Sequence, residues 1–228
     1  MNEMTLPHLG KRTITAAFGL FLFAVGIYAQ MVAGMGTSPW NVLNDGLAHL
    51  VHISFGQASI ILSFVIVIAD VVLGEPIGVG TLLDVFLTGT CVDFLSWLDP
   101  LPVPLSLLTK ILIVIVSMLI TSFGQYLYMG AGMSCGPRDA LLVAIGKRLP
   151  KLSIGLVSIG LMCLVTVAGA LLGGLTGLGT ILTMFGMGIC MDLVFHLMHF
   201  EPRVIHQEGL RETWADFKTA LTQTQGES

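Results

Sequence analysis

The sequence places an arginine at the start of a short predicted helix, an arrangement suited to binding an anion. Pro137 fits the first position of a helix, where its missing N–H is not needed, and Arg138 and Asp139 follow directly. Exposed N–H groups, the positive end of the helix dipole and a guanidinium together attract negative charge. The alternatives are an ion pair with a carboxylate or a contact with a lipid phosphate. The candidate carboxylates are Asp84, Asp139 and Asp192.

Asp84 is the acid best placed for directional chemistry. It lies inside an apolar stretch, where a carboxylate costs about 2.5–3.5 kcal/mol on insertion scales and is therefore a functional candidate. The chain repeats itself, and the position equivalent to Asp84 in the second copy is Thr183. Because the acid has no counterpart, we expect it to bind a proton or part of a solute. The alternative is a hydrogen bond with Thr88, one helical turn away, or with a neighbouring helix.

Three further acids lie in apolar stretches. Asp93 and Asp192 occupy equivalent positions in the two copies, so we expect them to serve the architecture, for example by hydrogen bonding to the end of a neighbouring helix. Asp70 lies near the end of its stretch, and we expect its carboxylate to reach out to water.

No pattern indicates an enzyme. Residues 132–136 fit Gly-x-Ser-x-Gly, but that nucleophile turn needs a preceding strand. His-Glu-x-x-His and Walker A spacings do not occur in the sequence, and Asp192 and His196 have no further metal ligand near them. The four cysteines are scattered through apolar stretches, which is typical of small buried residues. We expect no enzymatic activity, no cofactor and no metal.

The elements that hold these residues occur twice along the chain. Three segments of the first half recur in order in the second half, at an offset of 98 or 99 residues: 36–43 with 134–141, 78–83 with 177–182, and 88–93 with 187–192. One insertion in about a hundred residues indicates a duplication.

Composition indicates that lipid surrounds most of the chain. Of 228 residues, 54% are hydrophobic and only 11% are charged, and the mean hydropathy is +0.89. Soluble domains carry roughly a quarter of charged residues. The net charge of -4 argues against a nucleic-acid partner.

Six apolar segments approach the ~20 residues that cross a ~30 Å hydrocarbon core: about 12–33, 54–73, 77–98, 108–130, 153–173 and 177–198. Each copy holds three, so the repeats cover about 12–98 and 108–198. Because three is odd, the second copy is inverted, which is typical of transporters. The sequence predicts an all-α integral membrane protein, with two inverted three-helix repeats in a single membrane domain over 1–200.

Basic residues predict the orientation, because they concentrate in cytoplasmic loops. With the N-terminus inside, only Lys110 falls outside, and the cytoplasmic residues are Lys11, Arg12, Arg138, Lys147, Arg148, Lys151, Arg203, Arg211 and Lys218. We therefore expect a multi-pass protein of the bacterial inner membrane with both termini in the cytoplasm.

Two segments between the spans are too short and too polar to cross. Residues 38–52 and 137–150 each begin with proline after glycine-rich backbone, and we expect short interfacial or re-entrant helices. Ser38 is a good N-cap for the first. Trp40 can contribute to a binding site or can simply anchor the helix at the interface.

Glycine motifs open the third and sixth spans, where they allow close helix approach or a local break. Inversion places the first opening beside the 137–139 motif on the cytoplasmic face, and the second beside the 39–41 motif on the outer face. The candidate substrate-binding residues are therefore Pro39, Trp40, Asn41, Gly78, Gly80, Thr81, Asp84, Pro137, Arg138, Asp139, Gly177, Gly179 and Thr180. Among these, Asp84 is the candidate for proton coupling.

The polar tail over 201–228 has the pattern of an amphipathic helix. Leu210, Trp214, Phe217 and Leu221 recur at steps of four, three and four, which places them on one helical stripe. We expect this cytoplasmic helix to pack on the membrane surface or on the protein itself.

At these motifs the chain resembles the bacterial YczE/YyaS/YitT group of integral membrane proteins, most closely its YczE-like branch. The resemblance covers about 12–198 and rests on residues 36–43, residues 136–139 and the two Gly-x-Gly-Thr openings. Asn41 stands where the group typically has aspartate, so an acid is not essential there. The resemblance implies a multi-pass cell-membrane protein and names no substrate.

Two functions fit these observations. The first is a secondary transporter or export facilitator for a small anionic solute. The second is a non-transporting membrane scaffold or regulatory protein, for which the tail is the contact surface. The expected partners are the lipid bilayer and a small solute, and the sequence leaves a homo-oligomer open.

Overall fold

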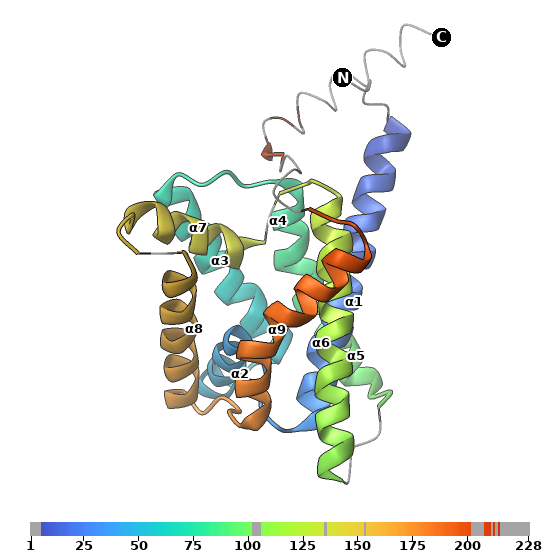
Figure 1. The fold of residues 1–228 in the computed structure, drawn as a ribbon, viewed down its shortest axis with the longest axis vertical. Helices are drawn as coiled ribbons and strands as arrows, with labels where there is room; N and C mark the ends of the chain where they lie inside the picture. The colour runs from blue at the N-terminus through green and yellow to red at the C-terminus, as the bar shows by residue number, and fades with distance from the viewer. Residues whose placement is uncertain are drawn as a thin grey trace, which may run out of the picture.

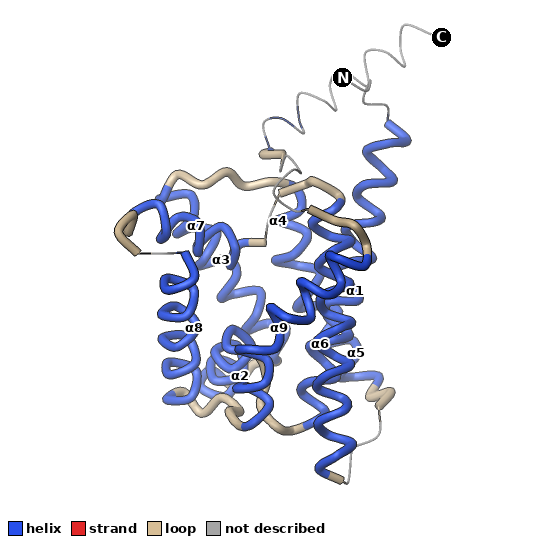
Figure 2. The backbone as a smooth tube through the Cα atoms, in the orientation of Figure 1, coloured by secondary structure: helices blue, strands red, loops and turns tan. Residues whose placement is uncertain are grey.

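The computed structural model describes residues 6–101, 106–134, 136–152, 154–201, 208–210, 212 and 214. This part of the chain is all-helical and contains no strand (Figures 1 and 2). The elements are α1 (Leu6–Ala33), α2 (Pro39–Val51), α3 (Phe55–Leu73), α4 (Val79–Leu83), the π-helix η1 (Asp84–Thr88), α5 (Gly89–Leu98), α6 (Leu107–Gly130), α7 (Pro137–Arg148), α8 (Ile154–Leu171) and α9 (Leu178–Leu197).

Five helical segments are long and apolar enough to cross a membrane: Leu9–Ala33, Phe55–Leu73, Val79–Leu98, Leu107–Gly130 and Leu178–Leu197. A sixth, Gly155–Leu171, is apolar but shorter. Large apolar side chains cover the outer faces of these helices; Val72, Leu171 and Phe185 are 79%, 83% and 66% exposed. Such faces are stable only against lipid, so the chain is a membrane protein.

The long helices α1 and α6 pack on each other and run in opposite directions (Figure 1). Glycines allow their backbones to meet: a Cβ at Gly19 would lie 2.7 Å from the Gly124 carbonyl oxygen, and one at Gly124 would lie 2.6 Å from that of Gly19. Small residues give membrane helices this close approach. α4, η1 and α5 pack on α1, and α9 packs on α6.

Gly124→Ala is expected to destabilise the protein by about 1–3 kcal/mol, because overpacking must force the two helices apart. Gly160→Ala on α8 is the matched control, since nothing lies within 4 Å of its Cβ position. Thermal unfolding in detergent measures both. An unchanged unfolding temperature for Gly124→Ala would contradict this packing.

The third predicted span is interrupted. Residues 79–98 form one rod of α4, η1 and α5, in which Asp84–Thr88 is a π-helix. The Thr88 hydroxyl donates to Asp84 Oδ1 at 2.7 Å. This is the local hydrogen bond that was predicted as the alternative to proton or solute binding by Asp84. Short π segments inside α-helices are frequent at functional sites. The composition of the span gives no sign of this interruption.

The short helix α7 packs against α3. At its start, Arg138 Nη2 lies 3.5 Å from Ser59 Oγ, in the second turn of α3. At its far end, Arg148 Nη2 donates to the carbonyl oxygen of Leu73, the last residue of α3, at 3.1 Å. These contacts hold α7 on α3 at both of its ends.

The short helix α2 packs against α8, which follows α7 in the second half of the chain. A Cβ at Gly169 of α8 would lie 2.6 Å from the Leu43 nitrogen. The Asp45 carboxylate accepts the Leu175 N–H at 2.7 Å, which ties α2 to the α8–α9 loop. Trp40 is 8% exposed in a core with Ile66 and other apolar residues, so the interpretation as an interfacial anchor is wrong.

The glycine openings lie against the loops that lead into the short helices. The Gly80 N–H donates to the Met133 carbonyl oxygen at 2.7 Å, and the Gly179 N–H donates to that of Met35, also at 2.7 Å. Met35 and Met133 are equivalent in the repeat, as are Gly80 and Gly179. Each opening thus meets the other half of the chain, as the sequence predicted.

Two acids behave differently from expectation. Asp70 is 1% exposed, and neither carboxylate oxygen has a hydrogen-bond partner among the described residues, so the prediction that it reaches out to water is wrong. Asp93 caps the start of α3 through the Gly56 N–H at 2.7 Å, which confirms its architectural role. Asp192 is exposed and makes no such contact within the described chain.

Little of the tail is described. Leu210, Glu212 and Trp214 are helical, whereas Phe217 and Leu221 lie outside the described residues. Glu208 forms an ion pair with Arg12 at 2.8 Å. The start of the tail therefore packs on the end of the bundle where α1 begins.

Candidate functional site

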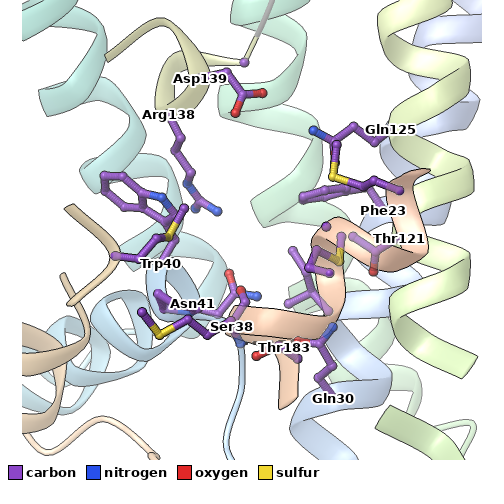
Figure 3. Close-up of a pocket in the computed structure, with 18 of the residues that line it drawn as sticks. Phe23, Gln30, Ser38, Trp40, Asn41, Thr121, Gln125, Arg138, Asp139 and Thr183 are labelled. Carbon is purple, nitrogen blue, oxygen red and sulfur yellow. Dashed lines mark hydrogen bonds between the residues drawn. The ribbon is translucent and has the colours of Figure 1, made fainter. Parts of the chain in front are cut away.

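A cavity of about 370 Å³ lies at the centre of the helices (Figure 3). Its walls come from α1, α6, α8 and α9, and the starts of α2 and α7 complete it. The lining residues are Leu20, Phe23, Ile27, Gln30, Ser38, Pro39, Trp40, Asn41, Asp84, Thr121, Gln125, Tyr128, Gly136, Arg138, Asp139, Ser158, Ile159, Met162, Thr183, Met184, Phe185, Met187, Gly188 and Met191.

Both short helices present their N-termini to this cavity. Each has proline in its first turn, and neither Ser38 nor Gly136 supplies a side-chain cap. Ser38 holds the N-cap position of α2, as predicted, but its hydroxyl makes no capping hydrogen bond. The Ser38 backbone N–H donates to Gln30 Oε1 at 3.3 Å. Pro39 and Pro137 have no N–H, and the Asn41 and Asp139 N–H groups donate to the Ser38 and Gly136 carbonyl oxygens at 2.8 and 3.1 Å. The first-turn donors that remain in the described chain are the N–H groups of Trp40 and Arg138. Two positive helix ends thus meet at one site.

Arg138 reaches into the cavity between these helix ends (Figure 3). Its guanidinium stacks over Trp40, with Cζ 5.7 Å from the ring centroid. Its hydrogen bond to Ser59 is long, at 3.5 Å, and no carboxylate of the described chain lies within ion-pair distance. Burial lowers the Arg138 pKa, and the nearby charges of Asp84 and then Asp139 oppose this shift. Since arginine stays protonated in proteins, the cavity holds a cation with open donors.

Two carboxylates share the cavity with Arg138. Asp84 lies beside the start of α7, because a Cβ at Gly136 would lie 2.9 Å from Asp84 Oδ2. Removal from water raises the Asp139 pKa to about 6; the Asp84 charge adds to the shift and Arg138 opposes it. These groups favour binding of protons as well as of an anion.

The rest of the wall is mostly apolar. Methionines and phenylalanines predominate, and the side chains are Leu20, Phe23, Ile27, Ile159, Met162, Met184, Phe185, Met187 and Met191. Methionine is flexible and polarizable, and it adapts to irregular apolar ligands. A few polar groups in an apolar cavity are typical of small-molecule sites.

Seven of the predicted site residues do not line this cavity. Thr81 hydroxyl donates to Ser134 Oγ at 3.1 Å, and Gly177 and Thr180 lie against Gly36. These residues make the crossing contacts between the halves, together with Gly78, Gly80 and Gly179. Pro137 is buried at the start of α7. The residues that do line it are Pro39, Trp40, Asn41, Asp84, Arg138 and Asp139.

The sequence reasoning missed the polar residues of the long helices. Gln30, Thr121 and Gln125 line the cavity from α1 and α6. Glutamine inside an otherwise apolar span is the signal that could have identified them. Thr183, the residue equivalent to Asp84 in the second copy, lines the same cavity. Asp84 and Thr183 therefore face one site, although the two copies carry different residues at this position.

The described residues contain no cluster of three or more His, Cys, Asp and Glu side chains that could hold a metal ion. The site's own donors are those of a guanidinium, two helix ends and several amides. These groups recognise an organic or oxygen-rich anion.

Comparison with known sequences places these residues in a family. A family of unknown function, DUF6198, matches residues 10–196, which include every residue of the cavity wall. The chain belongs to DUF6198. No solved structure matches the chain.

Three bacterial relatives extend the comparison. An uncharacterized protein of Haemophilus influenzae is 28% identical over 84% of this chain and 86% of its own length. The uncharacterized membrane protein YczE of Bacillus subtilis is 29% identical over 76% and 80%. The Bacillus subtilis protein YyaS is 27% identical over 80% and 92%. The predicted YczE/YyaS-type family is confirmed, and so is a multi-pass membrane protein.

Proposed function

We propose that this protein is a secondary transporter for a small monoanionic solute with an apolar body. The observation that carries the proposal is the convergence of Arg138 and two helix N-termini on one central cavity. Broken or short helices that point their N-termini at a midplane site bind the anionic groups of solutes in known transporters.

The charges of the site favour one negative group on the solute. Arg138 contributes one positive charge and faces two carboxylates, Asp84 and Asp139, so a dianion would meet excess repulsion. A single carboxylate can take the open guanidinium donors and the first-turn N–H groups together. The methionine-rich wall accommodates an apolar body of the same molecule.

The arrangement of the chain supports six spans in two inverted repeats. α1 and α6, which begin the two copies, run in opposite directions (Figure 1), and each glycine opening bonds to the other copy. Most loop cations lie at the end of the bundle where α1 begins, near Arg12 and Lys147. By the positive-inside rule this end faces the cytoplasm of a bacterial cell, and we propose that both termini lie on that side of the inner membrane. Arg138 lines the cavity, so it is not counted among the loop cations.

Asp84 is the proposed proton-coupling residue. It lies in the cavity, in a π segment, and its Oδ1 is held by Thr88. A proton on Asp84 would remove a negative charge beside the start of α7 and strengthen anion binding beside Arg138. Anion and proton would therefore move together.

A matched ligand series tests the solute class by thermal shift in detergent. Hexanoate, hexylamine and hexanol share one body and differ in the head group, whereas acetate has the head group alone. A ligand that binds only the native state raises the apparent stability. We expect hexanoate to stabilise most and acetate weakly, and stabilisation by hexylamine alone would overturn the anion site.

The scaffold alternative rests on the tail. Leu210 and Trp214 are 40% and 61% exposed, which suits a contact with a partner or with lipid. Residues 208–210 pack on the bundle through Arg12 and through the Leu210 N–H, which donates to the Ile77 carbonyl oxygen at 2.7 Å. A deletion designed to separate the two functions must leave these residues in place.

Removal of residues 215–228 is expected to leave hexanoate uptake into proteoliposomes within about twofold of the full chain, because surface changes remote from a site rarely matter. Glu208→Gln in the full chain is the control, because it removes the ion pair with Arg12 that holds the start of the tail on the bundle. Loss of function in the truncated chain, together with a co-purifying partner that only the full chain retains, would support the scaffold instead.

A further inference from the structure

The two halves of the chain carry the same capping residues. Ser54-Phe55-Gly56 begins the second span of the first half, and Ser153-Ile154-Gly155 begins that of the second half. The third spans match in the same way, with Gly89 and Asp93 in one and Gly188 and Asp192 in the other.

In the first half these residues are engaged. Asp93 Oδ1 accepts the Gly56 N–H at 2.7 Å, and Oδ2 accepts the Ser54 hydroxyl. The backbones touch beside this cap, since a Cβ at Gly89 would lie 2.6 Å from the Gly56 carbonyl oxygen. The carboxylate thus satisfies first-turn donors of α3 and closes α3 onto α5.

In the second half the equivalent residues are apart. Nothing lies within 4 Å of a Cβ at Gly155 or Gly188. Asp192 is exposed and has no hydrogen bond or ion pair within the described chain. The loop over 172–177 joins α8 and α9 at one end, and the helices diverge toward the other (Figure 1). Ser153 lies outside the described residues.

The separated ends border the cavity. Ser158 and Ile159 of α8 and Met187 and Met191 of α9 line it, on the side where these helices diverge. At the opposite end of the bundle, the Asp93 cap holds α3 against α5. The bundle is therefore closed at one of two equivalent places and open at the other.

We propose that Asp192 is a positioning residue that closes the second half by accepting the Gly155 N–H, as Asp93 does with Gly56. In that conformation α8 lies against α9, and the Asp93 cap is released. The proposal rests on the inverted repeats of the proposed transporter, because inversion makes the two closures alternate between the membrane faces. An acid in this membrane segment also gains a partner it otherwise lacks.

Glycine supplies a second, steric test. Gly155→Ala is free of contacts in the described conformation. In the closed conformation its methyl group would meet the backbone near Gly188, as one at Gly56 would meet the Gly89 carbonyl oxygen. We therefore expect this variant to fold normally and to lose only the closed form.

Double electron–electron resonance measures the distance between spin labels on α8 and α9, so it detects the closure without a known solute. Nitroxides are placed at Gly160→Cys and Ile189→Cys, which are exposed positions, in a chain whose four native cysteines are replaced by alanine. The protein is reconstituted into lipid nanodiscs. The expected result is two distance populations, of which the longer matches the described structure.

Asp192→Ala is expected to lower the ratio of short to long distances about fivefold, the effect of losing one helix cap. Gly155→Ala removes the short population, and Asp93→Ala raises it. Size-exclusion profiles and helical circular dichroism check that each variant is folded. A single long distance in the parent, or a ratio that Asp192→Ala leaves unchanged, would overturn the proposal. If the protein shows these distance changes but takes up no solute, only the proposed transport function is overturned.

Discussion

Arg138→Gln is expected to lower the affinity for hexanoate by about 10- to 150-fold, since hydrogen bonds to a charged group contribute about 1.5–3 kcal/mol. The guanidinium faces the cavity with one long hydrogen bond, to Ser59, and a stacking contact with Trp40. Glutamine keeps a donor but loses the charge and the two-pronged geometry. Titration by thermal shift, with hexanoate as the ligand, gives the affinity of each variant.

Arg148→Gln is the matched control for this substitution. Arg148 lies on the same helix, eleven residues of α7 away from Pro137, and bonds to the Leu73 carbonyl oxygen outside the cavity. It should bind hexanoate as the parent does. Equal losses in the two variants would mean that α7 contributes only its packing, and the anion site would have to be abandoned.

Asp84→Asn is expected to abolish proton-driven accumulation of hexanoate while exchange of labelled for unlabelled solute continues. Asparagine resembles the protonated acid in shape and has no charge to titrate, so binding persists without coupling. Accumulation under an imposed pH gradient and exchange at equal pH are measured in the same proteoliposomes, with protein-free liposomes as the blank. The ratio of the two rates, compared with the parent, reports coupling alone.

Asp45→Asn provides the comparison for Asp84→Asn, because Asp45 lies on α2 outside the cavity and accepts the Leu175 N–H. Its ratio of accumulation to exchange should equal that of the parent. If Asp84→Asn also keeps that ratio, the proton is carried elsewhere. Asp139 then becomes the first candidate, since it shares the cavity and its pKa is raised to about 6.

Hydropathy and repeat patterns predicted the elements well. The predicted spans 54–73 and 177–198 correspond to α3 (Phe55–Leu73) and α9 (Leu178–Leu197). A long apolar segment in lipid must satisfy its own backbone hydrogen bonds, so it forms a helix. The proline-started segments also became helices, α2 and α7. Their depth could not be predicted, since a polar helix of this length fits either the interface or a protein-lined cavity.

The contact between the two short helices is the largest difference from expectation. Inversion placed Trp40 and Arg138 on opposite membrane faces, yet the Arg138 guanidinium stacks 5.7 Å from the centre of the Trp40 ring. The starts of both short helices line one cavity. The two motifs therefore form one site, and the sequence reasoning had assigned them to two.

Identical residue types also proved insufficient to predict contacts. Asp93 and Asp192 were expected to act alike, but only Asp93 caps a helix in the described chain. The difference depends on where α8 lies relative to α9, which is a tertiary property. Nor did any residue pattern indicate the π-helix at Asp84–Thr88.

The fluorescence of Trp40 tests the central claim, that one cavity between the two short helices binds the solute. Trp97 and Trp214 are 80% and 61% exposed, so replacing both by phenylalanine leaves Trp40 as the sole reporter of the three tryptophans. The account predicts a saturable change on titration with hexanoate, absent with hexanol and lost in Arg138→Gln. Thermal stabilisation by hexanoate without any change at Trp40, or a change that survives Arg138→Gln, would contradict it.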